Sequence, residues 1–172
     1  SVDAVVTSAH FIDDGFATTL RAEGEIDGLF GGAVPLIAVE GFVTHQESGL
    51  RASGIQVYGV DDRFWAFQGV DPEVYPLGRR DVFVSEGLAR ELEVAVDDTL
   101  LVRVEMPSAI PISSLHGRRE DSGRTLRLGI DRVLTAVEHG EFSFRPQQGL
   151  ARSVFVSLTR LQQVLEQDGK IN

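Results

Sequence analysis

Four histidines are the side chains of this sequence best suited to ligate a metal or to move a proton at neutral pH, namely His10, His45, His116 and His139. No two of them have the i, i+4 spacing that places two ligands on one helix face, and the H-E-x-x-H motif is absent. His10 could meet a metal together with Asp13 and Asp14, although a surface histidine beside a turn is the commoner origin of such a pattern. Cysteine is absent, which excludes disulfides, thiol catalysis and Cys-based zinc or iron–sulfur sites. We therefore predict no metal and no other cofactor.

A serine nucleophile would need a rigid element that holds it beside a base. The G-x-S-x-G turn is absent. Ser113, Ser114 and His116 lie close together, with Asp121 nearby, but all belong to one long loop, whereas a triad is assembled by a rigid scaffold from distant segments. A hydrolase built on Ser113 or Ser114 with His116 is our third hypothesis. Phosphate-binding motifs of the G-x-G-x-x-G and Walker types are also absent.

Adjacent acids and aromatic residues are the remaining candidates for chemistry. The acid pairs are Asp61-Asp62, Asp97-Asp98 and Glu120-Asp121. Such pairs more often form turns and keep the surface soluble than carry out acid–base catalysis. Phe64, Trp65 and Phe67 could form a binding platform, but aromatic residues beside a turn are more often core anchors. No constellation supports catalysis, so we predict that the chain is not an enzyme.

The composition is that of a soluble globular protein. A length of 172 residues suits about one domain, which buries roughly 70% of the unfolded chain's surface. The net charge of −10 disfavours nucleic acid as a partner. The longest apolar run, residues 33–39, is far shorter than the about 20 residues that a membrane span needs. Because the first residue is Ser1 and the only methionine is Met106, we expect a piece excised from a longer protein.

Hydrophobic periodicity predicts short strands and short helices in mixed order. The predicted strands cover residues 4–7, 34–43, 55–60, 82–84, 99–104, 126–130, 142–144 and 154–156. The predicted helices cover residues 17–30 and 63–67, a segment with Ser85 as its N-cap, and a final segment with Ser157 as its N-cap. This mixture indicates an α+β fold. The segment 105–123 is long for a loop in a compact domain, and loops of that length are often functional.

Several of these segments together resemble the extracytoplasmic domain of FtsX-like, or MacB-like, ABC transporter permeases. Residues 57–65 (VYGVDDRFW) resemble that family's V-x-G-V-D-x-x-F/Y segment. Residues 82–92 (VFVSEGLAREL) with 96–100 (VDDTL) resemble V-V-L-S-E-x-L-A-x-x-L followed by V-G-D-T-L. Residues 128–133 resemble the strand near V-x-A-V-L, and residues 154–162 resemble F-V-P-L-x-x-L-Q. The match covers most of residues 55–165 in the family's order, with Asp97 in place of glycine and Ser157 in place of proline.

The resemblance implies an organisation and a function. It implies that residues 1–80 are the first part of a Porter-like subdomain and that residues 81–172 are a β-rich, Sabre-like inserted part. It implies a non-catalytic domain that couples ATP hydrolysis to substrate or partner handling outside the inner membrane. The ATP would be hydrolysed by a cytoplasmic ABC ATPase subunit or domain, reached through membrane helices outside this chain. An extracytoplasmic partner protein, or a lipid or lipoprotein cargo, would be the contact on the periplasmic side.

The long loop is our candidate contact surface for such a partner. Its apolar residues Ile110, Ile112 and Leu115 stand among polar ones, beside Arg118 and Arg119. We expect that deletion of residues 108–122 leaves the melting temperature nearly unchanged and abolishes transport-linked function. The alternative from a different class is a freestanding extracytoplasmic ligand-binding or sensory domain. An apolar span of about 20 residues upstream in the gene would support the permease, and a signal peptide alone would support the binding domain.

Overall fold

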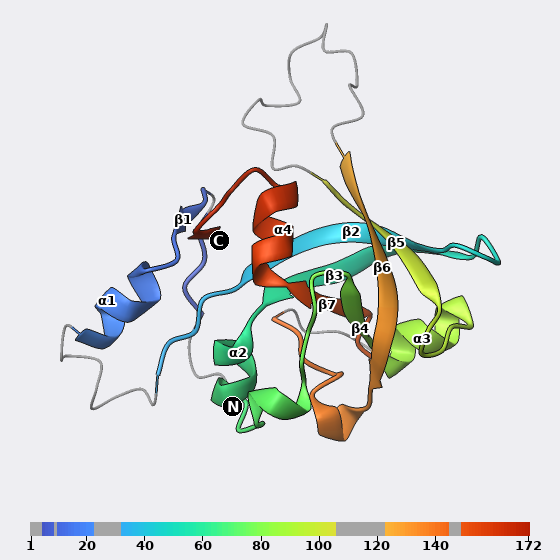
Figure 1. Cartoon of the computed structure of the whole chain (residues 1–172), viewed down its shortest axis with the longest axis horizontal. Helices are drawn as coiled ribbons and strands as arrows, with labels where there is room; N and C mark the ends of the chain where they lie inside the picture. The colour runs from blue at the N-terminus through green and yellow to red at the C-terminus, as the bar shows by residue number, and fades with distance from the viewer. Residues whose placement is uncertain (1–4, 9, 23–31, 106–122, 145–148) are drawn as a thin grey trace, which may run out of the picture.

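A closed barrel of six strands forms the centre of the computed structural model, which describes residues 5–8, 10–22, 32–105, 123–144 and 149–172 (Figure 1). The barrel strands are β2 (Ile37–His45), β3 (Arg51–Val60), β4 (Asp81–Ser85), β5 (Thr99–Glu105), β6 (Gly123–Leu134) and β7 (Ser153–Ser157). Their order around the barrel is β2-β3-β7-β4-β6-β5. Because the barrel closes on itself, none of these strands is left as a free sheet edge.

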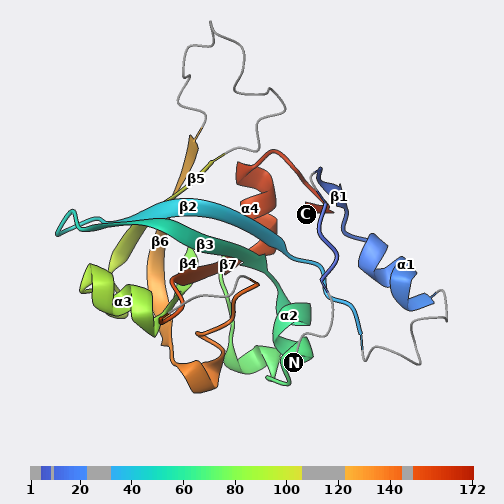
Figure 2. The same cartoon turned by 180° about the vertical axis from the view of Figure 1, so that it is seen from behind.

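Short helices and one small strand pair surround the barrel. The helices are α1 (Phe16–Ala22), α2 (Asp62–Phe67), α3 (Glu86–Leu92) and α4 (Leu158–Val164), with 3-10 turns η1 (Pro72–Val74) and η2 (Ala136–Glu138). The small pair consists of β1 (Ile12–Asp13) and β8 (Lys170–Ile171). Both views place α1 and β1 at one end of the molecule and α3 at the other (Figures 1 and 2). Over the described residues, no helix has the length and apolarity that a membrane crossing requires.

The barrel is built from two halves with the same order of elements. The first half runs β2-β3-α2-β4-α3, and the second runs β5-β6-η2-β7-α4. The strand pairings match as well, because β3 lies parallel to β7 just as β6 lies parallel to β4. The two halves also pair with each other through β4 and β7, which are antiparallel and place Phe83 opposite Phe155. Each of these strands carries the sequence Val-Phe-Val-Ser, so the topological repeat has a trace in the sequence.

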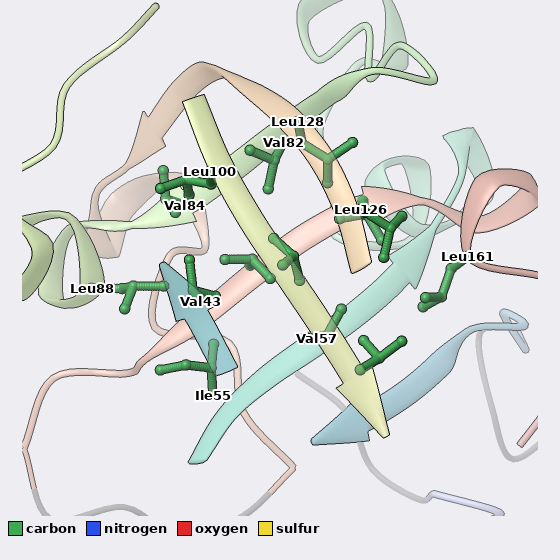
Figure 3. Packing of buried hydrophobic residues seen from close by; sticks show 14 of the residues in the cluster. Val43, Ile55, Val57, Val82, Val84, Leu88, Leu100, Leu126, Leu128 and Leu161 are labelled. Atoms are coloured by element: carbon green, nitrogen blue, oxygen red, sulfur yellow. The ribbon is translucent and has the colours of Figure 1, made fainter. Parts of the chain in front are cut away.

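Aliphatic side chains fill the inside of the barrel. Figure 3 shows side chains from several strands and helices meeting there, including Val43, Val57, Val84, Leu100 and Leu126. All five are fully buried. Burying one such side chain contributes about 1.5–3 kcal/mol relative to leaving it exposed, so this cluster supplies the main stabilising term of the domain. A second, aromatic cluster packs outside the barrel wall and is described with the site below.

The structure confirms the α+β fold class and most of the predicted elements. The predicted helix after Ser85 is α3, and the Ser85 side chain accepts a hydrogen bond from the backbone N–H of Leu88. The strand predicted over residues 34–43 is β2, which has a register shift against β3 between Gly41 and Phe42. Gly41 is required there, because a Cβ atom would overlap the carbonyl oxygen of Arg103 on β5.

Two predicted strands are wrong within the described residues. Residues 5–7 are not in a strand, and the first strand is instead the two-residue β1, which pairs with β8. Phe142 and Phe144 are not in a strand either, but lie in the loop after η2. Their alternation arises because both rings pack against Tyr58, which lies on β3. The predicted helix over 17–30 is α1 up to Ala22, and the remainder lies outside the described residues.

The barrel takes strands from both sides of the predicted boundary at residue 80. β2 and β3 precede that position, β4 to β7 follow it, and β3 pairs directly with β7. Within the described residues the two parts therefore share one hydrogen-bonded barrel. Their assignment to Porter-like and Sabre-like subdomains remains a prediction.

Candidate functional site

The most prominent candidate site is an apolar cavity of about 250 Å³ beside the barrel. Five parts of the chain line it: the N-terminal segment with β1 and α1, the run that enters β2, helix α2, the loop after η2, and the C-terminal residues. The lining residues are Val5, Val6, Thr7, Ile12, Phe16, Ala17, Gly32, Ala33, Val34, Leu36, Ala38, Phe64, Phe67, Gln68, Phe142, Phe144, Ile171 and Asn172. Segments from both ends of the described chain thus meet at one cavity.

One wall of the cavity is aromatic and well packed. The Phe142 ring contacts Phe64 at a centroid distance of 5.1 Å and Phe144 at 4.9 Å, in both cases edge to face. Tyr58 lies behind them, 5.2 Å from Phe142, and Phe155 joins the same cluster. Edge-to-face pairs at these distances contribute about 0.5–1.5 kcal/mol each beyond their buried area. The wall is therefore held firmly by the aromatic cluster outside the barrel.

Helix α2 brings Phe64 and Phe67 to the cavity. The Asp61 side chain accepts a hydrogen bond from the backbone N–H of Arg63, which caps the first turn of α2. Phe64 is almost fully buried, whereas Phe67 is more than a third exposed at the cavity. Sequence analysis favoured core anchors over a binding platform for these aromatic residues. The structure assigns the core role to Phe64 and Trp65, and it places Phe67 at the cavity.

The opposite wall is held by the β1–β8 strand pair and is linked to α2 by an ion pair. Ile12 on β1 pairs with Ile171 on β8, and the backbone N–H of Asp14 donates to the carbonyl of Gly169 at 2.9 Å. Arg63 at the start of α2 lies 2.6 Å from the Asp61 carboxylate and 3.8 Å from that of Asp14. The hydrogen bond to Asp61 raises the pKa of Arg63 above its ordinary value, with a further contribution from Asp14. The guanidinium therefore stays charged and links the N-terminal segment to α2.

The chemistry that this lining can supply is limited. Among the described residues that line the cavity, the polar ones are Thr7, Gln68 and Asn172, and none is charged. The Asn172 side chain pairs with the Ala38 backbone, because it accepts from the Ala38 N–H at 2.9 Å and donates to the Ala38 carbonyl at 3.0 Å. The cavity thus offers apolar surface and few polar contacts, and it contains no acid, base or metal ligand from these residues.

A histidine, a serine and an aspartate that sequence analysis did not connect meet at another place. The Ser48 Oγ is 2.8 Å from His45 Nδ1, and His45 Nε2 is 3.9 Å from Asp98 Oδ2. Ser48 also accepts from the Leu50 N–H, and Asp98 accepts from the Ala95 N–H. Both side chains therefore stabilise turns, and none of the three residues lines the cavity. The hydrogen bonds of Ser48 and Asp98 to nearby backbone N–H groups therefore indicate a structural role for this group.

The candidate residues from the long loop lie outside the described residues. These are the contact residues Ile110, Ile112, Leu115, Arg118 and Arg119, and the hydrolase candidates Ser113, Ser114 and His116. The structure does describe the strands that carry this loop, and Glu105 of β5 is paired with Gly123 of β6. In the part of the chain that the structure describes, no group of three or more His, Asp or Glu side chains could hold a metal, and this includes the surroundings of His10.

Sequence analysis missed most of the cavity residues. Val5 and Val6 were assigned to a strand, and Phe142 and Phe144 to another. Large apolar residues in segments rich in turn residues were the sequence feature that could have indicated these positions. Only the tertiary arrangement shows that the two segments line one cavity.

The chain is similar to known proteins in structure but not in sequence. No family model matches the chain, and no curated protein sequence matches it. The chain is similar to the crystal structure of the periplasmic region of MacB from Actinobacillus actinomycetemcomitans, with a TM-score of 0.49 and 9% sequence identity. The similarity covers 94% of this chain and 62% of that one, so this chain spans less than two thirds of its length.

Proposed function

We propose that the chain is the non-catalytic extracytoplasmic domain of an ABC transporter permease of the FtsX-like, MacB-like family. The observation that carries this proposal is the ordered set of family-like segments in the sequence. Three of them coincide with a strand and the helix that follows it: residues 57–65 with β3 and α2, residues 82–92 with β4 and α3, and residues 154–162 with β7 and α4. The resemblance therefore extends to repeated structural units and is not confined to loops.

In this role the domain would transmit motion rather than perform chemistry. A cytoplasmic ABC ATPase subunit or domain would hydrolyse ATP, and the domain would move as one body outside the inner membrane. The closed barrel suits that task, because its strands have no free edge and its aliphatic core is fully buried. The apolar character of the cavity supports a non-catalytic role, since acid–base catalysis needs a titratable group near the substrate.

The long loop between β5 and β6 remains our candidate for contact with an extracytoplasmic partner protein or a lipid or lipoprotein cargo. The pairing of Glu105 with Gly123 means that the loop joins two adjacent strand ends. A short turn can therefore replace residues 108–122 without separating the strands. This geometry makes the loop deletion a practical test of the contact role.

A freestanding ligand-binding or sensory domain is the second candidate. The apolar cavity favours it, because concave apolar sites with a few polar groups are the usual form of small-molecule sites. Such a domain would reach the extracytoplasmic space through a secretion signal alone and would have no ATPase partner.

Fractionation of cells that express the full-length gene product separates the two candidates. A permease is expected in the inner-membrane fraction, resistant to extraction with high salt or carbonate and released by detergent. Recovery in the soluble extracytoplasmic fraction would support the binding domain instead. Recovery in the cytosol would contradict both.

A further inference from the structure

The cavity has an apolar rim as well as apolar walls. Val5, Val6, Phe16 and Phe67 are large apolar side chains that are exposed to solvent, and all four line the cavity. Val6 is the most exposed of them, at 69%. Exposed apolar groups that gather around a hollow, rather than being scattered singly, indicate a surface that binds an apolar ligand.

The charges near the start of α2 disfavour an anionic ligand. Asp14 and Asp61 flank α2, and the nearby cation Arg63 is already engaged by both carboxylates. The whole chain carries a net charge of −10, which adds a repulsive field. A phosphate or carboxylate near the start of α2 would therefore meet two carboxylates, and Arg63 is already paired with both of them. The polar lining residues Thr7, Gln68 and Asn172 all have uncharged side chains.

The size of the cavity points to one slender group. Small-molecule sites that enclose a drug-sized ligand usually measure about 300–1,000 Å³, whereas an apolar cavity of about 150 Å³ binds benzene. At about 250 Å³ the cavity lies between these sizes. It can hold one hydrocarbon chain, or part of a molecule, while the remainder stays outside.

We propose that this cavity binds a single hydrocarbon chain whose polar head is uncharged and remains at the mouth. The aromatic wall of Phe64, Phe142 and Phe144 would contact the chain along one side, and the aliphatic residues Val34 and Leu36 would contact it along another. The proposal rests on the cavity alone and does not depend on membership of a transporter.

Fluorescence displacement with the full 172-residue chain tests this proposal. N-phenyl-1-naphthylamine, an uncharged apolar fluorophore, is expected to bind and to be displaced by monodecanoylglycerol below its aggregation concentration. Burial of each methylene group strengthens binding about fourfold. Monooctanoylglycerol has two methylene groups fewer than monodecanoylglycerol, so it should bind about 15-fold more weakly. Decanoate, which has the same chain and a negative head, should compete much less well than monodecanoylglycerol. Equal competition by decanoate, or no dependence on chain length, would overturn the proposal.

Matched variants locate the binding. Val34→Asp places a charge in the cavity wall and should weaken binding of monodecanoylglycerol at least tenfold. Val6→Asp changes an exposed rim residue, so it should weaken binding with little effect on folding. Val137→Asp is the control, because Val137 is 90% exposed and does not line the cavity. Unchanged affinity in folded Val6→Asp, or an equal loss in Val137→Asp, would show that the chain binds elsewhere or nowhere specific.

Discussion

At the scale of single residues, Asp97 occupies a backbone conformation that glycine adopts at lower cost. Its φ is 76°, in the left-handed region that disfavours L side chains by roughly 1–2 kcal/mol. Its backbone N–H donates to the carbonyl of Ile130 at 2.8 Å, which fixes the turn between α3 and β5 against β6. The family-like segment V-G-D-T-L has glycine at this position, where a positive φ costs no side-chain strain.

Asp97→Gly should therefore stabilise the domain. Relief of the left-handed strain exceeds the entropy that glycine adds to the unfolded chain, so the free energy of unfolding should rise by about 0.5–1 kcal/mol. Urea unfolding followed by circular dichroism measures the change. Asp98→Gly is the control and should destabilise, because the Asp98 carboxylate accepts from the Ala95 N–H at 2.8 Å. A loss of stability in Asp97→Gly would contradict the strain argument.

At the scale of elements, the two Val-Phe-Val-Ser strands end in serines with different roles. Ser85 is fully buried, and its Oγ donates to the Ala151 carbonyl at 2.7 Å and accepts from the Ser153 N–H at 3.1 Å. It also caps α3. Ser157 occupies the same position before α4 but makes no capping hydrogen bond through its side chain. Sequence analysis predicted a cap at both serines, because the residue type and position are the same.

Ser85→Ala should cost far more stability than Ser157→Ala. Removing Ser85 Oγ leaves buried backbone groups without a partner in addition to removing a cap, so we expect a loss of about 2–3 kcal/mol. Ser157→Ala should change the free energy of unfolding by about 0.5 kcal/mol or less, the usual size for a surface change. Thermal and urea unfolding of the two variants provide the comparison. Equal losses would show that the buried hydrogen bonds of Ser85 contribute little.

The turn η2 contains a group whose effect on stability depends on pH. Glu138 accepts from the Thr135 N–H at 3.1 Å and from the Thr135 hydroxyl at 2.8 Å, and the backbone hydrogen bond is the main reason that its pKa is lowered. A lowered pKa means that the charged form stabilises the folded state. The contribution is therefore present above the ordinary pKa of 4.5 and is lost as the pH falls through the lower folded value.

Glu138→Ala should thus destabilise the protein at pH 7 by about 0.5–1 kcal/mol, in the range of other capping interactions. The difference from the parent should shrink as the pH falls from 5 toward 3. Urea midpoints measured across that range check the dependence. A difference that stays constant with pH would mean that the charge of Glu138 does not contribute.

At the scale of the whole molecule, local patterns predicted the element types but not their assembly. The strands around Val57, Val82 and Val154 and the cap at Ser85 follow from alternation and residue type, which act over a few neighbours. The barrel order depends on pairings such as β3 with β7, whose partners lie nearly 100 residues apart in the sequence. The cavity depends on the same long-range packing, since Val34 and Phe142 meet only in the folded chain.

The repeated halves show where a sequence signal was available. Val-Phe-Val-Ser begins at residue 82 and again at residue 154, a separation of 72 residues, which is longer than the periods of solenoid repeats. The identical stretch is short, and the connecting segments differ in length. The repeat becomes evident when the two copies pair antiparallel at Phe83 and Phe155.

Thiol labelling tests most directly whether this domain lies outside the inner membrane, as the proposed function requires. The chain contains no cysteine, so Val137→Cys in the full-length protein adds one thiol at a site that is 90% exposed. Spheroplasts are treated with a membrane-impermeant maleimide, and the unsubstituted full-length protein gives the background. We predict that Val137→Cys is labelled in intact spheroplasts as completely as after lysis. Labelling that appears only after lysis would place the domain in the cytoplasm and contradict the proposed function.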